Sequence, residues 1–164
     1  MAIALLTLAL VGTLGLLASV VLGYGIPEHH LLKHHFVLAL ASTFILVMAH
    51  SFIMFFLIAT GVELKDMEKA AGWGQSFRQR TIALKSQVFP VMTLALMLVI
   101  ANFITGAAAH TRAVPMAVHA LVSWTTLAVC VLALYREYQV LGANNRLIGE
   151  AASRREDTPR PGTV

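Results

Sequence analysis

Four long apolar segments alternate with short polar ones along the chain. The apolar segments are 3–23, 36–60, 88–109 and 114–134, and none of them contains Asp, Glu, Lys or Arg. An α-helix needs about 20 apolar residues to cross the hydrocarbon core of a bilayer, which is about 30 Å thick. Each segment is long enough, and a helix satisfies its own backbone polar groups in lipid. The pattern therefore predicts an all-α integral membrane protein, a bundle of four transmembrane helices.

The chain has 164 residues, enough for a single membrane domain, which we place at 1–153. The remaining segment, 154–164, is rich in charged residues, Pro and Gly and is predicted to be a polar C-terminal tail. The first apolar segment lacks preceding basic residues and exceeds the apolar part of a typical signal peptide. We therefore expect it to be a retained transmembrane helix.

Lys and Arg are unevenly distributed over the connections between these segments. The connection 61–87 holds five of them and the chain after residue 134 holds five, whereas each of the other two connections holds one. Basic residues close to transmembrane helices stay on the cytoplasmic side. The distribution predicts a protein of the cytoplasmic (inner) membrane with both termini in the cytoplasm.

The cytoplasmic connection is itself predicted to be partly helical. Residues 61–69 continue the second helix as a charged extension, and a glycine-containing break follows. Residues 76–85 are then expected to lie along the membrane surface, with Trp73 and Phe77 as interfacial anchors. The last helix is expected to continue over 137–152 as a C-terminal extension.

Charge and composition narrow the function. The formal net charge is +4, but the basic residues flank apolar segments and form no basic patch with interleaved aromatic residues, so nucleic acid is not an expected partner. The expected partners are the lipid bilayer and other membrane-protein subunits or further copies of the chain. No Gly-rich phosphate loop, nucleophile elbow or carboxylate pair is present, which argues against a stand-alone enzyme.

Seven histidines are the one chemical signal in this apolar chain. Ionisable groups at membrane depth are costly and are often functional. His119 and Asn102 are predicted at a similar depth near the outer surface, together with Ser123 and the histidines around His35. His50 lies fifteen residues after His35, about 22 Å deeper on roughly the same helix face. Because no apolar segment contains a carboxylate, His50 has no predicted partner.

The first hypothesis for these histidines is a b-type haem, which needs two imidazoles at matched depth on facing helices. His35 and His119 meet this condition near the outer face if the helices tilt. His50 lacks a histidine at its depth, and Met97 is then the nearest soft ligand. The candidate cofactor-binding residues are His35, His50, Met97, Asn102 and His119.

The second hypothesis is a metal site at the outer surface. The tract 28–35 is rich in histidine, and His30 and His34 are i,i+4 neighbours that present their rings on one helical face. Zinc and copper suit imidazole ligands. The candidate metal ligands are His29, His30, His34, His35 and His110.

Three functions stay open at this point. The first is a small subunit of a redox (electron-transfer) complex that binds haem b or contacts quinol through its membrane histidines. The second is a non-catalytic structural or assembly subunit, whose histidines only pack and hydrogen-bond. The third is a protein that binds or transports metal at its outer face. A proton relay through the histidines is a further possibility, but the apolar segments offer no carboxylate to complete it.

Overall fold

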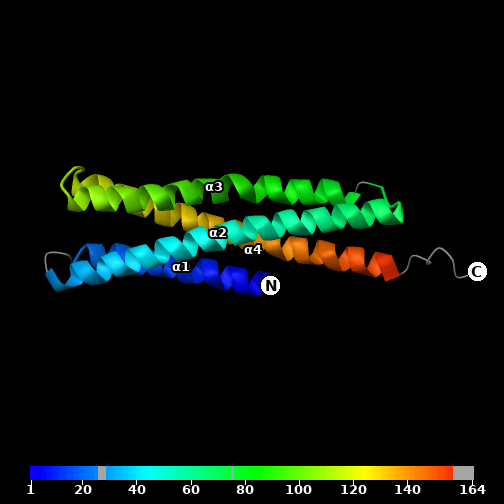
Figure 1. Ribbon diagram of the computed structural model, residues 1–164, viewed down its shortest axis with the longest axis horizontal. Coiled ribbons are helices and arrows are strands. Elements are labelled where there is room, and N and C mark those ends of the chain that lie inside the picture. Colours follow the sequence, from blue (N-terminus) through cyan, green and yellow to red (C-terminus); the bar gives the residue numbers. More distant parts are fainter. Residues whose placement is uncertain (26–28, 75, 157–164) are drawn as a thin grey trace, which may run out of the picture.

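The computed structural model describes residues 1–25, 29–74 and 76–156, all of the helices included. The helices are α1 (Ala2–Gly23), α2 (His29–Ala71), α3 (Ser76–His110) and α4 (Met116–Glu156). Consecutive helices run antiparallel, so that α1 and α2 form one hairpin and α3 and α4 form the other (Figure 1). The predicted fold class is confirmed: the described chain is an all-helical bundle whose four helices are long and apolar enough to cross a membrane.

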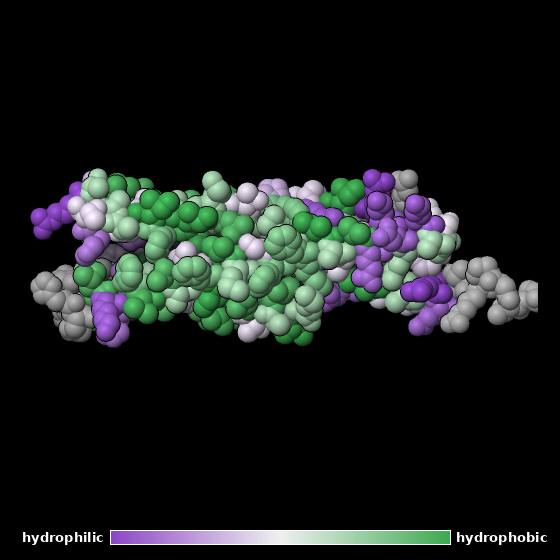
Figure 2. Space-filling model, viewed as in Figure 1, coloured by the Kyte–Doolittle hydropathy of each residue, from purple (hydrophilic) through white to green (hydrophobic). Residues whose placement is uncertain are grey.

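The surface of the bundle explains why it belongs in lipid. Large apolar side chains point outward from every helix, among them Leu14, Phe44, Ile104 and Leu121. Figure 2 shows this apolar belt over most of the length of the molecule, with hydrophilic residues gathered toward the ends. A soluble protein rarely exposes so large an apolar area, whereas a bilayer covers it without cost.

The four helices differ in length. With 22 residues, α1 is about 33 Å long and matches the hydrocarbon core of a bilayer. The other three have 35 to 43 residues and continue beyond the N-terminal end of α1, which lies near the middle of the long axis (Figure 1). We call this three-helix part, residues 58–71, 76–87 and 142–156, the extension.

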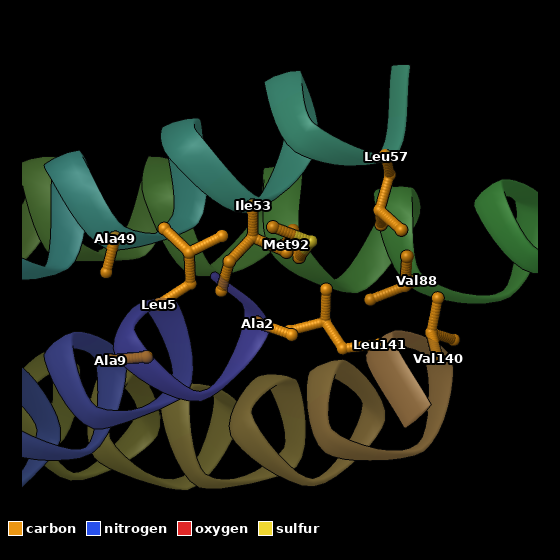
Figure 3. Packing of buried hydrophobic residues seen from close by; sticks show 10 residues of the cluster. All are labelled: Ala2, Leu5, Ala9, Ala49, Ile53, Leu57, Val88, Met92, Val140 and Leu141. Atoms are coloured by element: carbon orange, nitrogen blue, oxygen red, sulfur yellow. The ribbon is translucent and has the colours of Figure 1, made fainter. Parts of the chain in front are cut away.

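The core of the bundle consists of stacked apolar layers. In Figure 3, Leu5 of α1 lies beside Ile53 of α2, and Met92 of α3 and Leu141 of α4 complete the layer. Close packing of α1 on α2 depends on small residues, as a Cβ on Gly15 would lie 2.5 Å from the Ser42 Oγ atom. The two helices of the first hairpin therefore pack tightly against each other.

The extension has a core of its own, which corrects the prediction for 76–85. This segment does not lie on the membrane surface: it is the first part of α3 and packs between α2 and α4, where Phe77 is buried with Leu64 and Leu147. The backbone N–H groups of Phe77 and Arg78 donate to the buried Glu68 carboxylate, at 2.5 and 3.0 Å. A carboxylate at this position satisfies the free N–H groups of a helix N-terminus.

The ends of the long helices follow the sequence closely. The break expected after residue 69 is confirmed, because α2 ends at Ala71 and the turn uses Gly72 and Gly74 at φ values of +67° and +83°. The continuation of α4 is also confirmed, and it runs through Glu156. The predicted tail therefore begins inside this helix, and its residues 157–164 lie outside the described part of the chain.

Candidate functional site

A cavity of about 710 Å³ lies between the two hairpins, at the end of the bundle remote from the extension. The hairpins separate toward this end, where α1 ends and α4 begins (Figure 1). The volume falls in the range of small-molecule and cofactor sites, about 300–1,000 Å³. Most of the cavity wall is apolar, and its polar lining includes Ser19, His35, Asn102, His119 and Ser123.

Two histidines from different hairpins meet in this cavity. His35 comes from the first part of α2 and His119 from the first turn of α4. Their ring centroids are 6.4 Å apart and their ring planes are inclined at 80°. The sequence predicted that these two histidines meet if the helices tilt. In the structure the hairpins separate at this end of the bundle, and both rings lie in the cavity between them.

The ring orientation of His35 is fixed by α1. Its Nδ1 lies 2.8 Å from the carbonyl oxygen of Ser19. A carbonyl oxygen only accepts, so Nδ1 carries the hydrogen and Nε2 keeps its lone pair. An N–H donated to a backbone carbonyl is the usual way in which proteins prepare a histidine to bind a metal through its other nitrogen.

The same reasoning applies to His119. The Thr105 hydroxyl donates to the carbonyl of Asn102 at 3.1 Å, so its oxygen is free to accept from Nδ1 of His119 at 3.4 Å. When Nδ1 carries the hydrogen in this contact, Nε2 of His119 keeps its lone pair. Gly106 leaves room for this ring, because a Cβ at that position would lie 3.0 Å from the His119 Cε1 atom.

The inner end of the cavity is polar. The Ser123 hydroxyl lies 2.7 Å from Asn102 Oδ1 and 2.8 Å from the carbonyl oxygen of His119, and these two acceptors share its single hydrogen. Asn102 and Ser123 are both buried. The structure thus brings together around one cavity the residues that the sequence placed in an outer polar layer.

A second polar group lies deeper in the bundle. His50 of α2 and Glu137 of α4 are completely buried, and His50 Nδ1 lies 2.5 Å from Glu137 Oε1. This contact corrects the expectation that His50 has no partner. The fourth apolar segment ends at residue 134, but α4 continues without a break, and its next turn places the carboxylate at the level of His50. The signal in the sequence was the seven-residue spacing of Ser123, Cys130 and Glu137, which keeps all three on the buried face of α4.

No family model, curated protein or solved structure matches this chain. A function is therefore inferred from two groups of residues in the structure, His35 with His119 and His50 with Glu137.

The remaining predicted ligands lie elsewhere. Met97 is 65% exposed and points away from the core, so Glu137, and not Met97, is the group that faces His50. His110 lines the mouth of the cavity together with Lys33. His34 is exposed, and the side chains of His29 and His30 lie outside the described residues.

The structure gives no support to the zinc or copper hypothesis. Within the described part of the chain, no three or more His, Cys, Asp or Glu side chains come together in a way that could hold a metal ion. Two histidines alone suit a haem, because the porphyrin supplies the other ligands to the iron.

Proposed function

We propose that this chain is a small subunit of a membrane electron-transfer complex and holds a haem b between His35 and His119. The observation that carries the proposal is the meeting of these two rings across the cavity, 6.4 Å apart between centroids. At this separation both imidazoles would be able to bind one metal ion that lies between them. When bound, a haem b takes up and releases single electrons by cycling between Fe(III) and Fe(II).

The surroundings of the two rings support this assignment. Both Nδ1 atoms are occupied by neighbouring oxygens, which leaves Nε2 of each ring for the iron. The apolar wall of the cavity suits the porphyrin, while Lys33 and His110 at the mouth offer positive or hydrogen-bonding groups to its propionates.

A single haem in a small subunit requires electron donors and acceptors outside it. The described chain shows no second pair of facing histidines, so electrons would enter and leave through partner subunits or a quinol that reaches the cavity mouth. The alternative is a non-catalytic structural or assembly subunit, in which the same histidines serve only as hydrogen-bonding groups in the core.

An optical spectrum tests the proposal. We expect the detergent-purified protein, produced with an ample haem supply, to contain about one haem b per chain with two axial histidines. Reduction with dithionite should sharpen and shift its Soret band, and pyridine extraction should give the spectrum of haem b. A correctly folded, colourless protein that also fails to bind added haemin would contradict the proposal and favour the structural alternative.

We also propose that both termini and the extension lie in the cytoplasm and that the cavity opens on the opposite side of the inner membrane. The excess of Lys and Arg in the extension supports this orientation. Ala70 and Ala113 are exposed at the two ends of the bundle, whereas the native Cys130 is buried.

Cysteine labelling of intact cells tests the orientation. A membrane-impermeant maleimide should label Ala113→Cys in intact cells and Ala70→Cys only after the membrane is broken, because charged reagents do not cross the bilayer. The unmodified chain is the control, since its buried thiol should not react. The reverse labelling pattern would show that the orientation is opposite.

A further inference from the structure

His50 and Glu137 meet across the middle of the bundle, from helices that belong to different hairpins. Both side chains are 0% exposed, and His50 Nδ1 lies 2.5 Å from Glu137 Oε1. Ala49, Ile53 and Met92 belong to the apolar layers beside them. Ala49 and Ile53, which flank His50 on α2, belong to the same core cluster as Leu5 and Ala9 of α1 (Figure 3). His50 therefore lies within the part of the bundle that α1 covers.

The described helices bring no compensating charge to this pair. Residues 2–23 of α1 contain no ionisable side chain, and α3 presents Val88, Met92 and Ala95 to the core. The titratable groups closest in sequence to this level are the Met1 amino group on α1, His35 and Glu63 on α2, Lys85 on α3, and Cys130, Tyr135, Arg136 and Tyr138 on α4. Of these, only Cys130 is buried in the core, about two turns from Glu137.

The hydrogen bond holds one proton between imidazole and carboxyl. With this proton in the hydrogen bond and a second hydrogen on Nε2, the pair has no net charge. Loss of a proton would leave a net negative charge in apolar surroundings, which is costly. In the neutral pair, Nε2–H is a donor and Oε2 is an acceptor, and neither has a hydrogen-bond partner among the described residues.

A third buried atom without a partner lies on the side of the extension. It is Nδ2 of Asn144, seven residues or about 10 Å further along α4. The Oδ1 atom of Asn144 accepts from the Thr60 hydroxyl at 3.2 Å. The residue after Thr60 is Gly61, and a Cβ on it would lie 2.7 Å from Nζ of the half-exposed Lys85. Polar groups thus lie between the surface of the extension and the level of Asn144, and the apolar residues Val140 and Leu141 lie between Asn144 and the buried pair along α4.

Buried polar atoms are rarely left without partners, and ordered water is the usual partner where protein groups are lacking. The three unpartnered atoms lie at two levels of the same core, about 10 Å apart along α4, and they offer donors and acceptors to water molecules at both levels. We infer that His50 and Glu137 form a proton-exchange site inside the membrane, connected through water beside Asn144 and Thr60 to the end of the bundle that carries the extension. The ligand of this site is a proton delivered by water, and the inference does not depend on a haem in the cavity.

Hydrogen exchange of the His50 ring tests the inference. The full-length protein is labelled with nitrogen-15 at histidine, and the His50 ring signals are assigned by their loss in His50→Gln. We expect the Nε2 proton to exchange with water far faster than the backbone N–H of Ile53, one turn away in the same core. A ring proton that is as long-lived in D₂O as that amide would overturn the inference, because a dry pair exchanges only when the helices open.

Two matched variants test the route. Asn144→Leu should slow the ring exchange by about tenfold or more, because it removes the polar step beside the extension while the Thr60 hydroxyl keeps its bond to the carbonyl of Phe56. Thr126→Val is the control: this residue is also buried on α4 but lies toward the cavity, and its hydroxyl is satisfied by Val122 at 2.7 Å. Equal effects of the two variants would overturn the proposed route. The ring proton of the unmodified protein can also exchange too fast to be observed. In that case, appearance of its signal in Asn144→Leu would support the proposed route, and absence of the signal in that variant would contradict the route.

Discussion

His35→Ala and His119→Ala are each expected to abolish stable haem binding and to give a colourless protein. Each variant removes one of the two axial ligands and leaves the iron with one imidazole in a cavity that opens to water or lipid. The measurements are the haem content after purification and the Soret titration of the haem-free protein with haemin. His34→Ala is the matched control, because His34 is the sequence neighbour of His35, is exposed and does not line the cavity.

A more conservative variant separates loss of the ligand from loss of the fold. Thr105→Val removes only the oxygen beside Nδ1 of His119, at 3.4 Å, and keeps the imidazole itself. Loss of such a supporting partner typically lowers metal affinity by about 10- to 100-fold.

Full haem content in both alanine variants, or equal loss in His34→Ala, would show that the two rings are not the ligands.

The buried pair is expected to show strong coupling in a double-mutant cycle. His50→Leu alone and Glu137→Leu alone should each lower the free energy of unfolding by about 3–5 kcal/mol, because each leaves one polar group buried without its partner. The double variant should be more stable than either single variant, since apolar side chains of similar volume suit these surroundings. Unfolding by SDS in mixed micelles measures all four proteins.

The exposed ion pair of the extension provides the comparison. The Arg80 Nη1 and Glu150 Oε2 atoms lie 2.8 Å apart, and both side chains are 52% exposed. The same cycle on this pair should give a coupling of about 0–1 kcal/mol, because water screens the charges. Additive effects at His50 and Glu137 would mean that their contact contributes no interaction energy, which would contradict the prediction of strong coupling.

Hydropathy alone does not predict how far the helices continue beyond the apolar segments. The apolar run of the second segment ends at residue 60, but α2 continues to Ala71 because Leu64 and Glu68 keep the i,i+4 spacing on its buried face. Residues 76–85 are too polar to be read as part of a span. This segment belongs to the bundle because Phe77 is buried in a cluster with Leu147, which lies near the other end of the chain.

The sequence by itself determined four helices that are long and apolar enough to span a membrane, and the break between α2 and α3. It also identified the histidines as the residues to consider for chemistry. These features follow from apolar length, glycine positions and spacing along one helix, all of which are local. Only the tertiary structure decided that His35 and His119 share a cavity and that Glu137 faces His50, because both pairings join helices from different hairpins. The lateral tilt and relative depth of those helices are set by packing across the bundle, which no single segment encodes.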